Sequence, residues 1–80
     1  MALYGITETE GSIAAATWQP VKAKTMLGAM RSATANQLFH GTTLGVAIAT
    51  PDGGWKPLAI KQPKDKLNMA SGAQPWRILN

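Results

Sequence analysis

The sequence predicts an α+β domain, in which one α-helix packs on one face of a small antiparallel sheet of about five strands. Before the middle of the chain, apolar and small residues recur at helical spacing. Two segments with the residue alternation of β-strands follow directly and are joined by a turn. A chain of 80 residues buries only about 60–65% of its unfolded surface. We therefore expect a single domain over residues 1–80, with one core and the order β-β-α-β-β-β.

The first strand is expected over Ala2–Thr9, where threonine and tyrosine favour extended backbone. The segment after it has two interpretations. Pro20 could open a helix over Val21–Gln37, since proline is accepted at the first helical position. We favour a second strand over Thr17–Lys24, because valine and alanine alternate there with lysines and Val21 lies off the apolar stripe of the helix.

The helix is expected over Met26–Gln37, with Thr25 as its N-cap. Its apolar or small stripe comprises Met26, Leu27, Met30, Ala33, Thr34, Gln37 and Leu38. Three residues point away from the stripe and are expected to be exposed: Arg31, Ala35 and Asn36. Gly41 follows where a helix C-cap needs a left-handed residue, and a strand begins after it.

A β-hairpin is expected next. Leu44, Val46 and Ile48 share the core face of its first strand, and the residues between them are small. In the turn Thr50-Pro51-Asp52-Gly53, proline sets the first backbone angle and glycine accepts a positive φ.

The hairpin is expected to return over Trp55–Lys61, with Leu58 and Ile60 on the core face. Pro57 has no N–H and cannot donate the hydrogen bond that a central strand needs at this position. We therefore expect this strand to lie at an edge of the sheet or to begin late. A polar loop follows over Lys61–Gly72.

A last short strand is expected over Pro75–Leu79, with Trp76 and Ile78 on one face. We expect Trp18 and Trp76 to fill the core between sheet and helix. Trp55 stands beside the hairpin turn and has two interpretations: it packs on the domain, or it stacks on a base or enters a protein pocket.

Charge is distributed unevenly along the chain. All eight basic residues fall within residues 22–80, together with two of the four acidic ones, and the net charge of the chain is +4. This balance indicates an acidic partner, either nucleic acid or a protein surface that holds nucleic acid, unless the charge serves only solubility. Lys22, Lys24 and Arg31 form the best basic group, with a merely solvated face as the alternative.

Residues suited to catalysis or metal binding are few. The chain has no cysteine, and His40 is its single histidine. Glu8 and Glu10 share one face of the first strand and are interpreted as a solvated edge rather than as metal ligands. No glycine-rich phosphate loop is present. We therefore expect no enzyme activity, no cofactor and no small-molecule substrate.

Nothing in the sequence indicates a membrane protein. The N-terminal segment lacks a basic region followed by an apolar one. The longest apolar runs fall far short of the roughly 20 residues of a membrane span. We expect a soluble, intracellular protein.

One stretch resembles a known family. The pattern Ala29-x-Arg31-x-Ala33-Thr34-x-x-Gln37-x-Phe39-x-Gly41-Thr42 precedes a hairpin that turns at Asp52-Gly53, then Leu58-Ala59-x-Lys61 and a late Trp76. It resembles small phage-encoded anti-CRISPR proteins that inhibit type I (Cascade or Csy) surveillance complexes. The resemblance covers roughly residues 23–61, and the flanks only loosely.

The resemblance implies one helix on a five-stranded antiparallel sheet, and steric inhibition without turnover. Such inhibitors grip the repeated backbone subunit of the complex, in the groove where guide RNA pairs with target DNA, and some promote non-specific binding of duplex DNA. The resemblance places Arg31 and Gln37 at positions that contact this subunit, and we add Asn36 as their neighbour. The implied location is the cytoplasm of the infected bacterial host.

The chain departs from the family pattern in three ways. Met30 and Ala35 stand where basic residues are expected, and the loop before Trp76 is longer. That loop carries Lys61, Lys64 and Lys66. The candidate partner-binding residues are Arg31, Asn36, Gln37, Lys22, Lys24 and Trp55.

Two other classes of function remain open. A small nucleic-acid-binding regulator would contact phosphates through Lys22, Lys24, Lys64 and Lys66. A structural protein of a virion would assemble through a self-complementary edge such as Trp55–Lys61.

Overall fold

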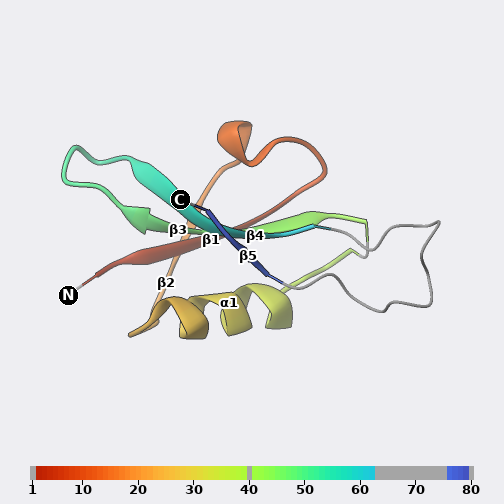
Figure 1. The fold of residues 1–80 in the computed structure, drawn as a ribbon, viewed down its shortest axis with the longest axis horizontal. Helices are drawn as coiled ribbons and strands as arrows, with labels where there is room; N and C mark the ends of the chain where they lie inside the picture. Colours follow the sequence, from red (N-terminus) through yellow and green to blue (C-terminus); the bar gives the residue numbers. More distant parts are fainter. Residues whose placement is uncertain (1, 40, 63–75, 80) are drawn as a thin grey trace.

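The computed structural model describes residues 2–39, 41–62 and 76–79. They form one helix packed on a five-stranded sheet, which confirms the predicted α+β class and the order of the elements (Figure 1). The elements are β1 (Tyr4–Thr9), η1 (Ile13–Ala15), β2 (Gln19–Val21), α1 (Met26–Ala35), β3 (Thr43–Ala49), β4 (Trp55–Lys61) and β5 (Arg77–Ile78).

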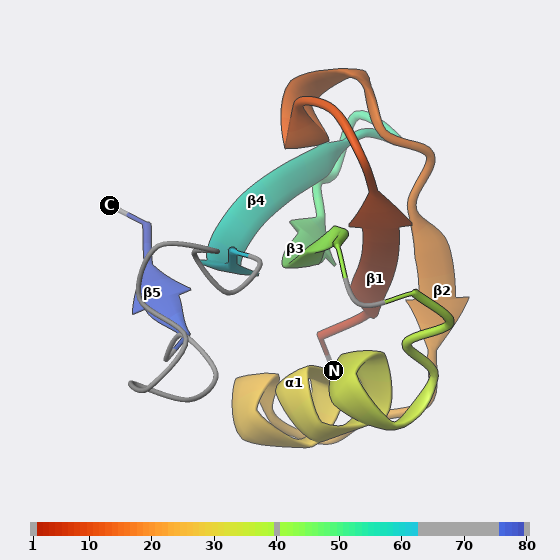
Figure 2. The ribbon, with the colours of Figure 1, turned by 90° about the vertical axis from the view of Figure 1, so that its right-hand side faces the viewer.

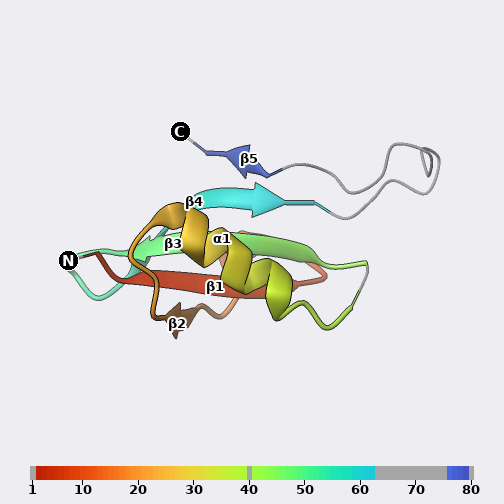
Figure 3. The ribbon, with the colours of Figure 1, turned by 90° about the horizontal axis from the view of Figure 1, so that it is seen from below.

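The strands lie in the order β2-β1-β3-β4-β5, and every neighbouring pair is antiparallel. Helix α1 crosses one face of the sheet over β1 and β3 (Figures 2 and 3). The 3₁₀ turn η1 lies on the opposite side of the sheet (Figure 1). In the described part of the chain, no helix is both long and apolar enough to cross a membrane.

Strand β2 decides between the two interpretations of the segment before the helix. Gln19–Val21 pairs with β1 through Tyr4↔Val21 and Ile6↔Gln19, so the longer helix from Val21 is wrong. The strand is shorter than the predicted Thr17–Lys24. Before it, Trp18 lies over a glycine on the face away from the helix, and after it the chain leads to Thr25, the N-cap of α1.

The start of α1 agrees with the prediction, because the Thr25 hydroxyl accepts a hydrogen bond from the Gly28 N–H at 3.1 Å. The helix ends at Ala35, earlier than the expected Gln37, because Asn36 caps it. The Asn36 side-chain amide donates to the Ser32 carbonyl at 2.8 Å. Gly41 is therefore not the C-cap: an asparagine supplies this function five residues earlier.

The buried face of α1 is narrower than the predicted stripe. Ala29, Met30 and Ala33 are buried, whereas Leu27 and Leu38 are 55% and 79% exposed. Small alanines allow the helix to approach the sheet closely, and leucines at the margin of the stripe are left outside the contact. The predicted exposure of Arg31, Ala35 and Asn36 is confirmed.

The core lies between α1 and one row of residues across the sheet. Ile6 pairs with Val46, and Val46 with Ala59, so the three side chains share the face under the helix. The expectation that Leu58 and Ile60 face this core is wrong. A bulge in the β3–β4 ladder leaves Leu58 without an opposite residue, and Ile60 then pairs with Gly45 on the other face.

The tryptophans divide between the two faces of the sheet. Trp76 is partly buried against the helix-side core, as predicted. Trp18 instead lies over Gly45, on the face away from the helix, and Trp55 lies over Gly5 on that same face. Trp55 thus packs on the sheet with part of its ring, and its contact with a base or a protein pocket stays a prediction. The remainder of the lysine-rich loop after Gln62 lies outside the described residues, as does Pro75.

Candidate functional site

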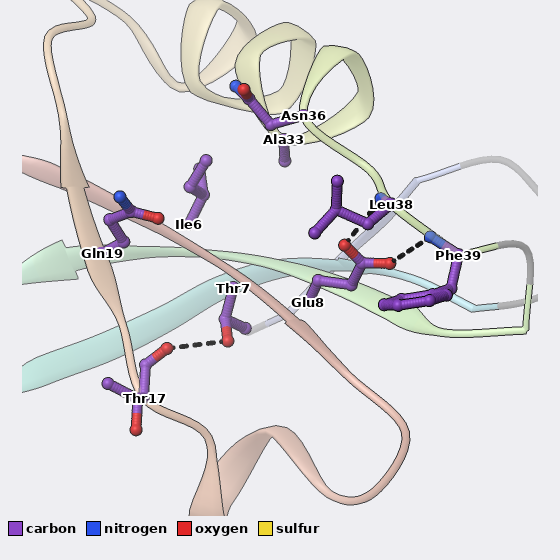
Figure 4. Close-up of a pocket in the computed structure, with 9 residues that line it drawn as sticks. All are labelled: Ile6, Thr7, Glu8, Thr17, Gln19, Ala33, Asn36, Leu38 and Phe39. Atoms are coloured by element: carbon purple, nitrogen blue, oxygen red, sulfur yellow. Dashed lines mark hydrogen bonds between the residues drawn. The ribbon is translucent and has the colours of Figure 1, made fainter.

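A cavity of about 310 Å³ opens where β1 continues beyond its pairing with Gln19, the first residue of β2 (Figure 4). The β1–β2 ladder stops at Ile6↔Gln19, so the following residues of β1 border open space instead of a strand. Nine residues line the cavity: Ile6, Thr7, Glu8, Thr17, Gln19, Ala33, Asn36, Leu38 and Phe39. The end of α1 and the segment after it therefore form one wall of this cavity.

Glu8 holds that wall in place. Its carboxylate oxygens accept hydrogen bonds from the backbone N–H groups of Leu38 and Phe39, each at 2.9 Å, and from the Thr42 hydroxyl at 2.6 Å. We call this arrangement the Glu8 clamp. The interpretation of Glu8 as part of a solvated edge is incomplete: β1 has no β2 partner at this residue, but the carboxylate ties β1 to a segment 30 or more positions further along the chain.

Hydrogen bonding keeps the Glu8 clamp charged. The Thr42 hydroxyl and the Leu38 N–H lower the pKa of Glu8 most, burial opposes them, and the Phe39 N–H adds a further lowering. These donors favour the ionised form of the carboxyl group. The clamp is therefore closed at neutral pH.

The Glu8 clamp presents two adjacent hydrophobic side chains to solvent. Leu38 is 79% exposed and Phe39 63%, although both backbone N–H groups are fixed. Exposed aromatic and aliphatic residues that are held in one conformation are typical anchors of a protein interface, because binding then costs little ordering entropy. With the two preceding residues they form what we call the helix-end tip: Asn36, Gln37, Leu38 and Phe39.

The structure brings together only some of the predicted site residues. Asn36 and Gln37 belong to the helix-end tip, and Arg31 lies on the exposed face of the same helix, about 7–8 Å away along its axis. Lys22 and Lys24 are exposed beyond the opposite end of the helix, before its N-cap. Trp55 lies on the far face of the sheet and cannot share this surface.

Arg31 borders a second concave region, on the flank of α1. This groove of about 330 Å³ is lined by Leu27, Met30, Arg31, Thr34, Ala35 and Trp76. Its walls are almost wholly apolar, and the Arg31 side chain borders them. The exposed side of the helix thus combines a cation with apolar surface.

The sequence did not single out Glu8 and Leu38 as site residues. Helical spacing assigns Leu38 to the buried stripe. No local pattern connects Glu8 to a segment 30 positions away. Phe39 and Thr42 did carry a signal, since both belong to the motif on which the family resemblance rests.

The described residues contain no group of three or more His, Cys, Asp or Glu side chains that could hold a metal ion. Comparison with protein-family models, with curated proteins and with solved structures finds no match for this chain.

Proposed function

We propose that this protein is a stoichiometric inhibitor that binds a backbone subunit of a type I CRISPR surveillance complex and sterically blocks target DNA. The observation that supports the proposal is the Glu8 clamp, which binds the backbone N–H groups of Leu38 and Phe39 beside Gln37 while both apolar side chains stay exposed. Three motif positions, Gln37, Phe39 and Thr42, take part in building this tip.

The chemistry of the tip suits a protein partner. Its two large apolar side chains can enter a pocket, and the adjacent amides of Asn36 and Gln37 can donate and accept hydrogen bonds around that pocket. Arg31 adds a charged contact at the margin. A specific interface buries about 1,200–2,000 Å² in total, so we expect the contact to extend from the tip along the exposed side of the helix.

In this proposal, inhibition occurs in the cytoplasm of the infected bacterial host, where the surveillance complex meets its target DNA. Neither turnover nor a cofactor is required, because the occupied groove excludes the DNA.

The first test is a gel shift of target duplex DNA with purified type I surveillance complexes of several subtypes. We expect this protein to abolish the specific shift with at least one subtype when it is added before the DNA, and to have little effect when it is added afterwards. Unchanged shifts with every subtype and in either order would refute the proposal.

Variants locate the contact. Arg31→Glu with Gln37→Ala, and separately Leu38→Ser with Phe39→Ser, should each weaken inhibition at least tenfold, because interface anchors contribute about 2 kcal/mol or more. Leu3→Ser is the matched control, since Leu3 is exposed and lies outside the tip. If both double variants fold and still inhibit fully, the contact with the complex does not lie at Arg31 or at the helix-end tip.

A second function is favoured by the exposure of Lys22, Lys24 and Arg31. A small regulator that binds duplex DNA through these cations would lose affinity with salt, at a log–log slope of about −0.9 per phosphate neutralised. Retardation of duplex DNA by the protein alone, with such a slope, would favour this function over inhibition of the complex.

A further inference from the structure

The face of the sheet opposite α1 differs in chemistry from the helix side. The ladders align Thr7, Gly45, Ile60 and Arg77 in one row across β1, β3, β4 and β5. Arg77 is the one charged residue that the register places on this face among the described strands. The face is therefore apolar or small, with a cation at one margin.

Both tryptophans of this face cover glycines, and Trp55 lies flat on its glycine. A Cβ atom built on Gly5 would lie 2.8, 3.0 and 3.1 Å from three consecutive ring atoms of Trp55, Cζ3, Cη2 and Cε3. Such similar distances mean that the Cβ would sit above the ring plane, because an edge-on ring would bring one atom much closer than its neighbours. Trp18 covers Gly45 with the outer part of its six-membered ring, at 2.9 Å for Cη2 and 3.2 Å for Cζ3.

The two rings are neighbours on the sheet. Gly5 pairs with Ala47, and Gly45 lies two residues along β3 from that partner, so the glycines are diagonal neighbours about 7–8 Å apart. The segment that carries Trp18 is fixed by a hydrogen bond of 2.9 Å, in which the buried Thr7 hydroxyl donates to the Thr17 carbonyl. Both rings are thus held against the sheet by backbone and side-chain contacts.

We propose that this face binds single-stranded nucleic acid, with one unpaired base stacked on Trp18 and another on Trp55. Both tryptophans are partly exposed, and each contacts the sheet at a glycine, so in this proposal the bases stack on the ring surfaces that point away from the sheet. Arg77 stands two strands, about 10 Å, from Gly45, within reach of a phosphate that links stacked bases. The net charge of +4 favours a polyanion.

Two features favour unpaired bases over other occupants. In a duplex the base faces are already stacked, so only single strands can offer them to an aromatic ring. Proline-rich peptides dock into grooves between aromatic side chains, whereas the Trp55 ring lies flat on the sheet. The binding surface is on the opposite side from the helix-end tip and does not depend on inhibition of a surveillance complex.

The test is fluorescence anisotropy with a labelled oligothymidylate of about 12 nucleotides, a length within the range of small stacking platforms. Trp18→Leu and Trp55→Leu keep apolar cover on the glycines but remove the aromatic face. We expect each to weaken binding by roughly 5- to 150-fold, as measured for single base–aromatic stacks. Trp76→Phe is the matched control, because Trp76 packs on the helix side.

Intrinsic fluorescence gives an independent readout in the Trp76→Phe protein, whose remaining tryptophans are those of the proposed surface. We expect the oligonucleotide to quench this fluorescence and the corresponding duplex to compete at least tenfold less well. Unchanged affinity in both leucine variants, equal competition by the duplex, or quenching by a proline-rich peptide but not by the oligonucleotide would overturn the proposal.

Discussion

At the scale of single residues, Glu8 joins parts of the chain that are far apart in sequence. One carboxylate satisfies two backbone N–H groups and a hydroxyl of the segment between α1 and β3. In that segment the side chains of Leu38 and Phe39 are exposed and do not pack into the core. The conformation of the helix-end tip is therefore set by a side chain on a different element.

Glu8→Gln tests this dependence on charge. The amide has one acceptor oxygen in place of two and carries no charge, so we expect a loss of about 1 kcal/mol in the free energy of unfolding. Amide hydrogen exchange of Leu38 and Phe39 should accelerate more than exchange within α1. Equal protection of the two amides in both proteins would contradict the clamp.

The same residue predicts a pH dependence. The folded state lowers the pKa of Glu8 below its ordinary value of 4.5. Its stabilisation is therefore complete above that value and is lost as the pH falls through the lowered pKa. We expect the difference in Tm between wild type and Glu8→Gln to shrink on acidification. A difference that stays constant from neutral to acidic pH would show that the charge of Glu8 is not involved.

At the scale of elements, α1 is a short helix whose ends are both defined by side chains. Thr25 caps its start and Asn36 its end. The buried side is made largely of alanine, so packing supplies less apolar area than leucines would. The caps consequently contribute a large share of the stability of this helix.

Thr25→Ala should therefore cost about 1 kcal/mol in the free energy of unfolding, the usual value for loss of an N-cap. Thr25→Ser keeps the hydroxyl that accepts from Gly28 and should retain most of the stability. Urea unfolding followed by circular dichroism measures both. If alanine and serine destabilise equally, the cap hydrogen bond is not the source of the effect.

At the scale of the whole molecule, the sheet has two different faces. The helix side buries Ile6, Val46 and Ala59 under α1. On the other side, the rings of Trp18 and Trp55 cover glycines of β1 and β3. Trp55 begins β4, yet it covers a glycine of β1, with β3 between the two strands. This contact joins the hairpin to the N-terminal strand across the sheet.

Gly5→Ala tests that long-range contact. The new methyl group would meet the Trp55 ring at 2.8 Å, so we expect destabilisation by about 1–3 kcal/mol, as for an overpacked core. Gly11→Ala is the matched control, because a Cβ on Gly11 meets no atom within 4 Å. Equal stability of the two variants in urea unfolding would show that Trp55 does not rest on Gly5.

The sequence by itself determined the fold class, the order of the elements, the N-cap at Thr25 and the position of the β3–β4 hairpin. These features depend on local spacing, alternation and turn chemistry, which are written in consecutive residues. The sequence likewise indicated that three residues are exposed or lie at the helix end: Arg31, Asn36 and Gln37. Their contact with a partner stays a prediction.

Only the tertiary structure decided which face each tryptophan covers, where the bulge shifts β4, and that Glu8 clamps the segment after α1. The face of Ile60 depends on one extra residue in a ladder, and a shift of one residue exchanges the two faces of a strand. The partners of Glu8 lie 30 or more positions away. No local pattern encodes such a pairing, because the packing of the whole sheet and helix brings the groups together.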